Sequence, residues 1–129
     1  MPAKDSCHDE VSHALQKDGW NINPKQPRLV ADIFAYIDIE AHKDEQDAFI
    51  EVKCFPGAND TQELYIAFGQ YIVYRELLAW LKPEAKLYLG IPDSVFARFP
   101  TTVLNTIQNN HVKIIVVDLE TETIVRWIN

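Results

Sequence analysis

Residues 49–55 carry two charged side chains in a pattern that could support phosphodiester chemistry. Glu51 and Lys53 are separated by one residue within an otherwise apolar run. Because side chains alternate between the two faces of a β-strand, both charged groups would project from one face, together with Phe49 and Phe55. Charges between two aromatic rings are expected to be partly buried, and buried charges persist when they are paired or bind a metal. The alternative is an edge strand whose charged face meets water.

A second acidic side chain, Asp38, stands between Ile37 and Ile39. Aspartate is unfavourable in strands, so this position calls for a physical cause. Side-chain alternation would put the two isoleucines on one face, and Asp38 and Glu40 on the other. If this segment forms a hairpin with the strand that carries Glu51, Asp38 would lie opposite that glutamate. A position at a strand end or a turn is the alternative for Asp38.

Two carboxylates at that separation repel each other unless a cation lies between them. Oxygen ligands of this kind suit Mg²⁺, which binds one or two carboxylates and keeps several waters. We therefore expect Asp38 and Glu51 to bind Mg²⁺. Lys53 would orient or deprotonate a water molecule, or stabilise the negative charge that develops on phosphorus.

The segment 60–81 is predicted to be a long helix that ends before Pro83, and it carries Gln70 and Tyr74 one turn apart on an apolar side. A buried glutamine needs partners for both ends of its amide. We expect Gln70 and Tyr74 to support the acidic cluster or to contact a DNA phosphate, and a bond from Gln70 to the sheet backbone is the alternative. The predicted apolar side consists of Ala67, Gln70, Tyr71, Tyr74, Leu77, Leu78 and Leu81.

A first helix is predicted over residues 6–18, with Ser6 as its cap and Gly19 at its end. Its apolar stripe is bordered by His8 and Glu10. Glu10 could reach a metal as an outer carboxylate, and His8 could form a hydrogen bond along the sheet edge. An ordinary solvated or core role is the alternative for each residue.

The remaining pattern predicts an α/β fold with a mixed β-sheet flanked by α-helices. The polar residues 42–47 would connect two strands in a hairpin, and a helix over 94–110 would be broken near Pro100. Strands are expected at 20–23, within the β-rich segment 29–41, and at 48–55, 86–91, 113–118 and 124–128.

Charge and composition limit the classes of function. Nineteen acidic residues against twelve basic ones give a net charge of -7. Nucleic-acid-binding proteins normally carry a basic face, so DNA binding by this chain would need a divalent metal, a partner protein or a local basic patch. Lys17, Lys25 and Arg28 are the candidates for such a patch.

The 129 residues, 47% of them hydrophobic, are typical of one domain with a substantial core. The sequence has no apolar run long enough to cross a bilayer, and its beginning lacks the apolar stretch of a signal peptide. We expect a single domain over 1–129 that is cytoplasmic and makes no membrane contact. In a reducing compartment, Cys7 and Cys54 are expected to be small buried hydrophobic side chains without a disulfide.

Asp38, then Glu51-Val52-Lys53, then Gln70 and Tyr74 resemble the PD-(D/E)xK nuclease superfamily in both order and spacing. That superfamily combines an aspartate on one strand, E-x-K on the next strand and Q-x-x-x-Y on the following helix. The resemblance implies a restriction-endonuclease-like sheet and Mg²⁺-dependent cleavage of DNA. It also implies a metal site formed by Asp38, Glu51 and the main-chain carbonyl of Val52, with Lys53 catalytic.

The chain also resembles the XisH family of DNA-element excision-controlling factors over nearly its whole length. It departs from the usual family pattern at Asn21-Ile22-Asn23-Pro24, where a His-Asp pair is absent. The resemblance rests on Ala14-Leu15-Gln16-Lys17-Asp18-Gly19-Trp20, Tyr36-Ile37-Asp38, Ile50-Glu51-Val52-Lys53, Gly69-Gln70-Tyr71, Tyr74-Arg75, Leu87-Tyr88-Leu89, Ile91-Pro92 and Ile124-Val125-Arg126-Trp127-Ile128.

The XisH resemblance implies a role in the excision of a DNA element during heterocyst differentiation in cyanobacteria. An XisI-like protein and a site-specific recombinase would be its partners, and a homo-oligomer is a further expectation. Two hypotheses follow: a Mg²⁺-dependent endonuclease acting on DNA, or a non-catalytic accessory protein that binds XisI or the recombinase. A nuclease masked by an inhibitory partner is a third possibility.

Overall fold

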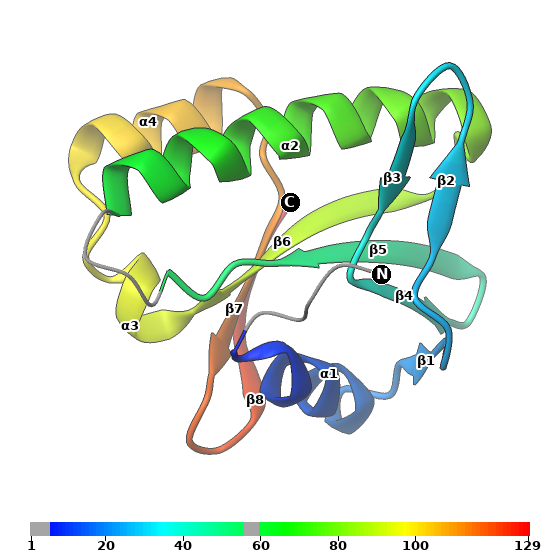
Figure 1. Cartoon of the computed structure of the whole chain (residues 1–129). Coiled ribbons are helices and arrows are strands. Elements are labelled where there is room, and N and C mark those ends of the chain that lie inside the picture. The colour runs from blue at the N-terminus through cyan, green and yellow to red at the C-terminus, as the bar shows by residue number, and fades with distance from the viewer. Residues whose placement is uncertain (1–5, 56–59) are drawn as a thin grey trace.

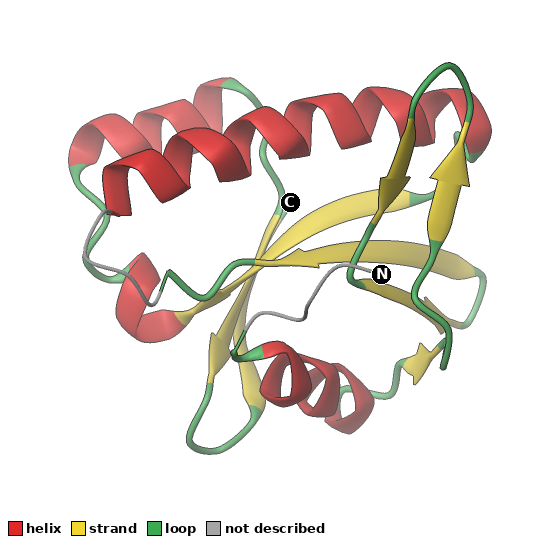
Figure 2. Cartoon of the chain, in the orientation of Figure 1, coloured by secondary structure: helices red, strands yellow, loops and turns green. Residues whose placement is uncertain are grey.

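A mixed six-stranded sheet organises the chain, and a computed structural model describes residues 6–55 and 60–129. Helix α1 packs on one face of the sheet, and α2, α3 and α4 pack on the other (Figures 1 and 2). Among the described residues, no helix combines the length and apolar character needed to cross a bilayer. In chain order the elements are α1 (His8–Lys17), β1 (Asn21–Ile22), β2 (Arg28–Val30), β3 (Phe34–Tyr36), β4 (Ile39–Lys43), β5 (Gln46–Val52), α2 (Asp60–Leu81), β6 (Lys86–Pro92), α3 (Asp93–Phe96), α4 (Thr101–Asn109), β7 (Ile114–Asp118) and β8 (Thr123–Ile128).

The strand order β1-β4-β5-β6-β7-β8 confirms the predicted mixed sheet. Strands β5, β6 and β7 are parallel neighbours, whereas the other pairs in this sheet are antiparallel. Parallel neighbours require crossover connections, which α2 supplies between β5 and β6, and α3 with α4 between β6 and β7. The predicted break near Pro100 is also confirmed, and the likeness to restriction endonucleases stays a prediction.

The two faces of β5 and of the residues after it pack into different hydrophobic clusters. Ile50, Val52 and Cys54 join the cluster beneath α1. Phe49 and Phe55 join the cluster beneath α2. The predicted alternation is therefore confirmed, and the intervening Glu51 and Lys53 belong to the α2 side of the sheet.

Helix α2 is fixed to the sheet through a buried tyrosine. Tyr71 is fully buried, and its hydroxyl donates a hydrogen bond to the carbonyl of Leu87 and accepts one from the N–H of Lys113, both at 3.0 Å. Leu77 and Leu78 are buried as predicted, whereas Leu81 at the helix end is 37% exposed. The tyrosine thus fixes the side of α2 that faces β5 and β6.

The β-rich segment 29–41 is divided among three strands. Strands β2 and β3 form a hairpin of their own, and β4 belongs to the main sheet. The prediction that Ile37 and Ile39 share a face is wrong, because they join opposite clusters. The chain bends at Asp38, and the N–H of Ile37 donates to the carbonyl of Pro27 at 3.1 Å. Asp38 therefore stands at a break in the strand pattern.

The hairpin between β4 and β5 is tighter than predicted. Both strands extend into the predicted connection 42–47, and Lys43 pairs with Gln46. Asp44, in the turn, adopts a positive φ of 54°. Strand β5 ends at Val52 and not at Phe55, although the N–H of Lys53 still donates to the carbonyl of Gly90 at 2.9 Å.

The beginning of α1 corrects two predictions. The residue before the helix is Cys7, which makes no side-chain cap, so Ser6 is not the cap. Cys7 and Cys54 form a disulfide, with both residues buried, so the prediction of two reduced thiols is wrong. Two cysteines 47 positions apart do not reveal this pairing, because it depends on α1 packing beneath the end of β5. Gly19, with φ of 93°, ends the helix as predicted.

The disulfide is expected to stabilise the fold by restricting the unfolded chain. Closing a loop over a separation of 47 residues contributes about 4 kcal/mol in the chain-entropy model. We predict that Cys7→Ser/Cys54→Ser loses free energy of unfolding of about this size. Urea unfolding of the oxidised protein and the double variant measures it, and reduced wild-type protein should match the variant. A difference below about 1 kcal/mol would contradict the prediction.

Candidate functional site

Asp38 and Glu51 meet where two neighbouring strands end. Ile39 pairs with Ile50 in the antiparallel β4–β5 ladder, so Asp38 and Glu51 are the next positions along. The N–H of Asp38 donates to Oε1 of Glu51 at 3.3 Å, and the N–H of Val52 donates to Oδ2 of Asp38 at 2.7 Å. Each carboxylate therefore accepts a hydrogen bond from the backbone of the other strand. The predicted approach of the two acids is present.

Glu51 carries the strongest electrostatic perturbation in this cluster. It is 6% exposed, and its pKa is raised to about 8, first by burial and then by the negative charge of Asp38. The ammonium group of Lys53 acts in the opposite direction and favours the charged carboxylate. Nζ of Lys53 lies 3.7 Å from Oε2 of Glu51, and its side chain is 20% exposed. Without a further cation, the pair of acids therefore tends to retain a proton.

Helix α2 supplies the two further residues predicted for the site. The pKa of the Tyr74 hydroxyl is raised by burial and then by the charges of Glu51 and Asp38, so this hydroxyl is within electrostatic range of the acids. Gln70 lies one helical turn earlier. Its side-chain oxygen is buried and has no hydrogen-bond partner among the described residues. A buried oxygen of this kind normally binds water or a ligand, so Gln70 offers an acceptor next to Tyr74.

The donor set fits a hydrated Mg²⁺ ion. Mg²⁺ typically uses one or two protein carboxylates and keeps several waters, which Asp38 and Glu51 can provide. Across residues 6–55 and 60–129, no group of three or more histidine, cysteine or acidic side chains is arranged to hold a metal. A site with a third acidic ligand is therefore not formed there. The roles expected for Glu10, a half-buried residue of α1, and for the Val52 carbonyl stay predictions.

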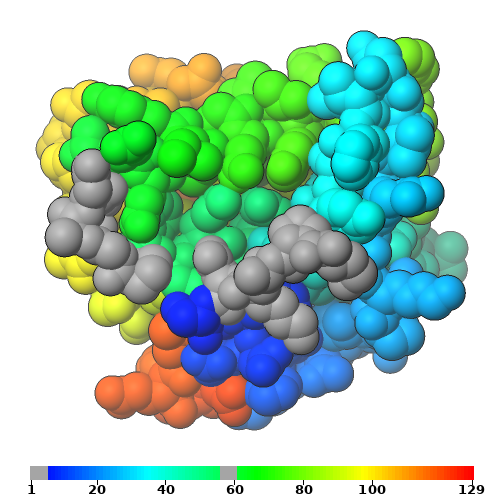
Figure 3. All heavy atoms as spheres, in the orientation of Figure 1, coloured from blue at the N-terminus to red at the C-terminus, as the bar shows by residue number. Residues whose placement is uncertain are grey.

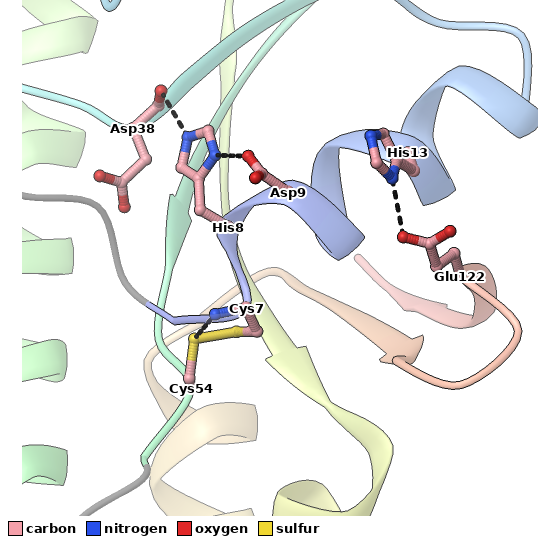
Figure 4. Close-up of polar contacts among 7 residues, drawn as sticks. All are labelled: Cys7, His8, Asp9, His13, Asp38, Cys54 and Glu122. Atoms are coloured by element: carbon pink, nitrogen blue, oxygen red, sulfur yellow. Dashed lines mark hydrogen bonds and ion pairs between the residues drawn. A yellow bond between two sulfur atoms is a disulfide. The ribbon is translucent and has the colours of Figure 1, made fainter.

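Helix α1 approaches the site from the opposite layer. Nε2 of His8 lies 3.5 Å from the carbonyl oxygen of Asp38, and Nδ1 lies 3.5 Å from Oδ1 of Asp9 (Figure 4). The hydrogen bond expected of His8 at the sheet edge is thus directed at Asp38 itself. The disulfide attaches Cys54, which follows Lys53, to the same helix. Sequence reasoning missed this link, because both cysteines were expected to be reduced.

Part of the predicted basic patch is used elsewhere. Nζ of Lys17 donates to the carbonyl of Thr121 at 2.7 Å, at the turn between β7 and β8. Arg75 of α2 donates to the carbonyls of Asn110 and His111. These two cations therefore join elements of the fold.

The raised pKa of Glu51 predicts a stability that depends on pH. The folded protein releases this proton near pH 8, whereas the ordinary value is 4.5, so the folded state binds more protons between the two values. The contribution to the free energy of unfolding is therefore full below the lower pKa and is lost as the pH rises through the higher one.

We predict that Glu51→Gln removes this part of the pH dependence. The variant should be more stable than wild type at about pH 9 and similar to it below about pH 4.5. Thermal unfolding of both proteins across this range gives the answer. Parallel pH profiles would show that Glu51 is not perturbed in the folded protein.

Comparisons with known proteins place the chain among relatives. The family described as XisH protein matches residues 1–125. The crystal structure of an XisH family protein from Nostoc punctiforme is 33% identical, with a TM-score of 0.89, and the alignment covers 97% of this chain and 100% of that chain. An fdxN element excision controlling factor protein from Anabaena variabilis is 34% identical, with a TM-score of 0.92, and the alignment covers 98% of this chain and 100% of that chain. No curated protein matches. The chain therefore belongs to the XisH family.

Proposed function

We propose that this protein is an excision-controlling factor whose Asp38–Glu51–Lys53 site hydrolyses a DNA phosphodiester with Mg²⁺. The observation that carries the proposal is the pair of backbone-fixed carboxylates, one of them buried, with an ammonium group 3.7 Å from Glu51. Burying like charges together is unfavourable unless a cation binds there. The family and its relatives support a role in the excision of a DNA element.

Each residue has a definable part in this reaction. When bound, Mg²⁺ would polarise the phosphate and lower the pKa of a coordinated water. Asp38 and Glu51 would hold the ion, and the Val52 N–H keeps one oxygen of Asp38 in a fixed direction. Lys53 would orient the attacking water or stabilise the charge on phosphorus. Gln70 and Tyr74 would bind water or a phosphate oxygen from α2.

We predict that Lys53→Ala and Asp38→Asn each lower DNA nicking in Mg²⁺ by about a hundredfold or more, because the first removes the ammonium group that acts on the transition state and the second removes the charge of a metal ligand. Nicking of supercoiled DNA by purified proteins, with and without EDTA, is the measurement. Lys86→Ala, at an exposed position on β6, is the matched control and should cleave normally. Unchanged cleavage by both site variants would exclude this site as the catalyst, and so would cleavage that survives EDTA.

A second candidate function is a non-catalytic accessory protein that binds an XisI-like protein or the recombinase. A surface hollow lined largely by apolar side chains favours it. It lies where the β2–β3 hairpin meets the carboxyl-terminal half of α2, and Figure 3 shows these two elements side by side. Trp80 is 65% exposed and Ile33 is 46% exposed, and Val73 also lines this hairpin surface. The net charge of -7 is no obstacle to protein binding. An exposed tryptophan such as Trp80 is a common anchor of protein interfaces.

For this second function, Ile33→Ser/Trp80→Ser should weaken binding to the partner by about tenfold or more, since anchor side chains dominate interface energies. Titration calorimetry with a purified XisI-like protein and with the recombinase measures the affinity. Val125→Ser, which changes an apolar residue of β8 that is 57% exposed, is the control. If wild type, the double variant and Val125→Ser bind the partner with equal affinity, the hairpin surface is not the interface.

A further inference from the structure

Cys7, directly before α1, and His8, the first residue of α1, hold the two segments that carry the site. Cys7 is covalently joined to Cys54, immediately after Lys53, so it fixes the end of β5. His8 contacts the carbonyl oxygen of Asp38 through Nε2 at 3.5 Å, at the start of β4 (Figure 4). The first turn of α1 therefore bridges the two segments whose carboxylates must stay together.

The position of His8 follows from the attachment of this turn. The His8 side chain is 13% exposed, and Cys7 and Cys54 are 2% and 7% exposed. Further along α1, Val11 is fully buried, and its N–H donates to the carbonyl of Cys7 at 3.1 Å. Val11 also packs directly against Gly90 of β6. A Cβ atom on residue 90 would lie only 3.2 Å from the Val11 side chain, so the glycine makes room for it. Val11 thus seats the helix on β6, and the disulfide holds its first turn.

We propose that His8 is a positioning residue for Asp38 and that the Cys7–Cys54 disulfide holds it in place, so that the site responds to thiol reductants. A thiolate of a dithiol attacks one sulfur, and the other cysteine leaves as a thiolate. The second thiol of the reductant then displaces the first cysteine. The products are two cysteine thiols and an oxidised dithiol, with two electrons transferred. Both sulfurs are buried, so the attack requires the first turn of α1 to open.

Two backbone amides report the position of Asp38 directly. The Val52 N–H donates to the Asp38 carboxylate, and the Asp38 N–H donates to Glu51. These hydrogen bonds exist without metal, DNA or catalysis. Any consequence for catalysis rests on the proposed function, whereas the structural coupling can be measured independently of it.

The experiment compares ¹H–¹⁵N spectra and amide hydrogen exchange of the full chain before and after treatment with a dithiol. Reduction should shift the amide signals of Val52 and Asp38. It should also accelerate exchange in the first turns of α1 by about tenfold or more, as expected for local opening. Thiol titration confirms that both cysteines are free. If both thiols are free and these amide signals and exchange rates keep their oxidised values, the coupling is overturned.

Variants of His8 separate its role from that of the disulfide. With the disulfide intact, His8→Ala should shift the Val52 and Asp38 amides, whereas His8→Gln should restore them, since its amide nitrogen can reach the place of Nε2. Equal spectra of wild type and His8→Ala would overturn the positioning role. Cys7→Ser/Cys54→Ser should resemble the reduced protein and should not respond to dithiol.

Mn²⁺ affinity, measured by calorimetry on the same samples, connects the coupling to the proposed function. Weaker Mn²⁺ binding after reduction would support the proposal that the disulfide, acting through His8, positions the metal site. Absence of Mn²⁺ binding in every sample would count against the proposed function alone, because the amide signals still decide whether His8 and the disulfide position Asp38.

Discussion

The reciprocal contact between Asp38 and Glu51 is the interaction on which the rest of the site depends. Each carboxylate accepts a hydrogen bond from the opposite strand, which holds the two acids at the end of the β4–β5 ladder. This geometry opposes their electrostatic repulsion with fixed backbone dipoles, although burial still disfavours the charged form of Glu51. The two carboxylates are therefore held in a fixed geometry that is stabilised when a proton or a cation binds to them.

The scaffold keeps this contact in place from both layers. Above the sheet, Tyr71 fixes α2 to β6 and to the residue before β7, and Tyr74, one turn later, is within electrostatic range of the acids. Below the sheet, α1 is attached by the disulfide and reaches Asp38 through His8. Asp38 can be contacted from both sides because the chain bends there before β4 begins. The bend that breaks the strand pattern is thus what exposes the aspartate to both layers.

Local periodicity was enough to predict the parts of the site that lie within one element. The alternation of Phe49, Glu51 and Lys53 follows from strand geometry, and the pairing with Asp38 requires only a hairpin between adjacent segments. Features that depend on distant contacts were missed. The bend before β4 involves Pro27, and the disulfide requires α1 to pack beneath β5. Tyr71 was predicted as part of an apolar stripe, but its hydroxyl partners come from β6 and from the residue before β7, both of which follow α2 in the chain.

The cost of burying Glu51 bears on the choice between a catalytic and an accessory protein. An accessory protein that used only the hairpin surface would gain nothing from a buried glutamate beside an aspartate, since glutamine has nearly the same shape without the charge. A cluster of this kind lowers stability near neutral pH, which is characteristic of sites shaped for a ligand. The lysine beside Glu51 only partly offsets the charge of the two acids. The buried pair of acids therefore favours the proposed cation site, and a partner bound to the hairpin surface would not compete with it.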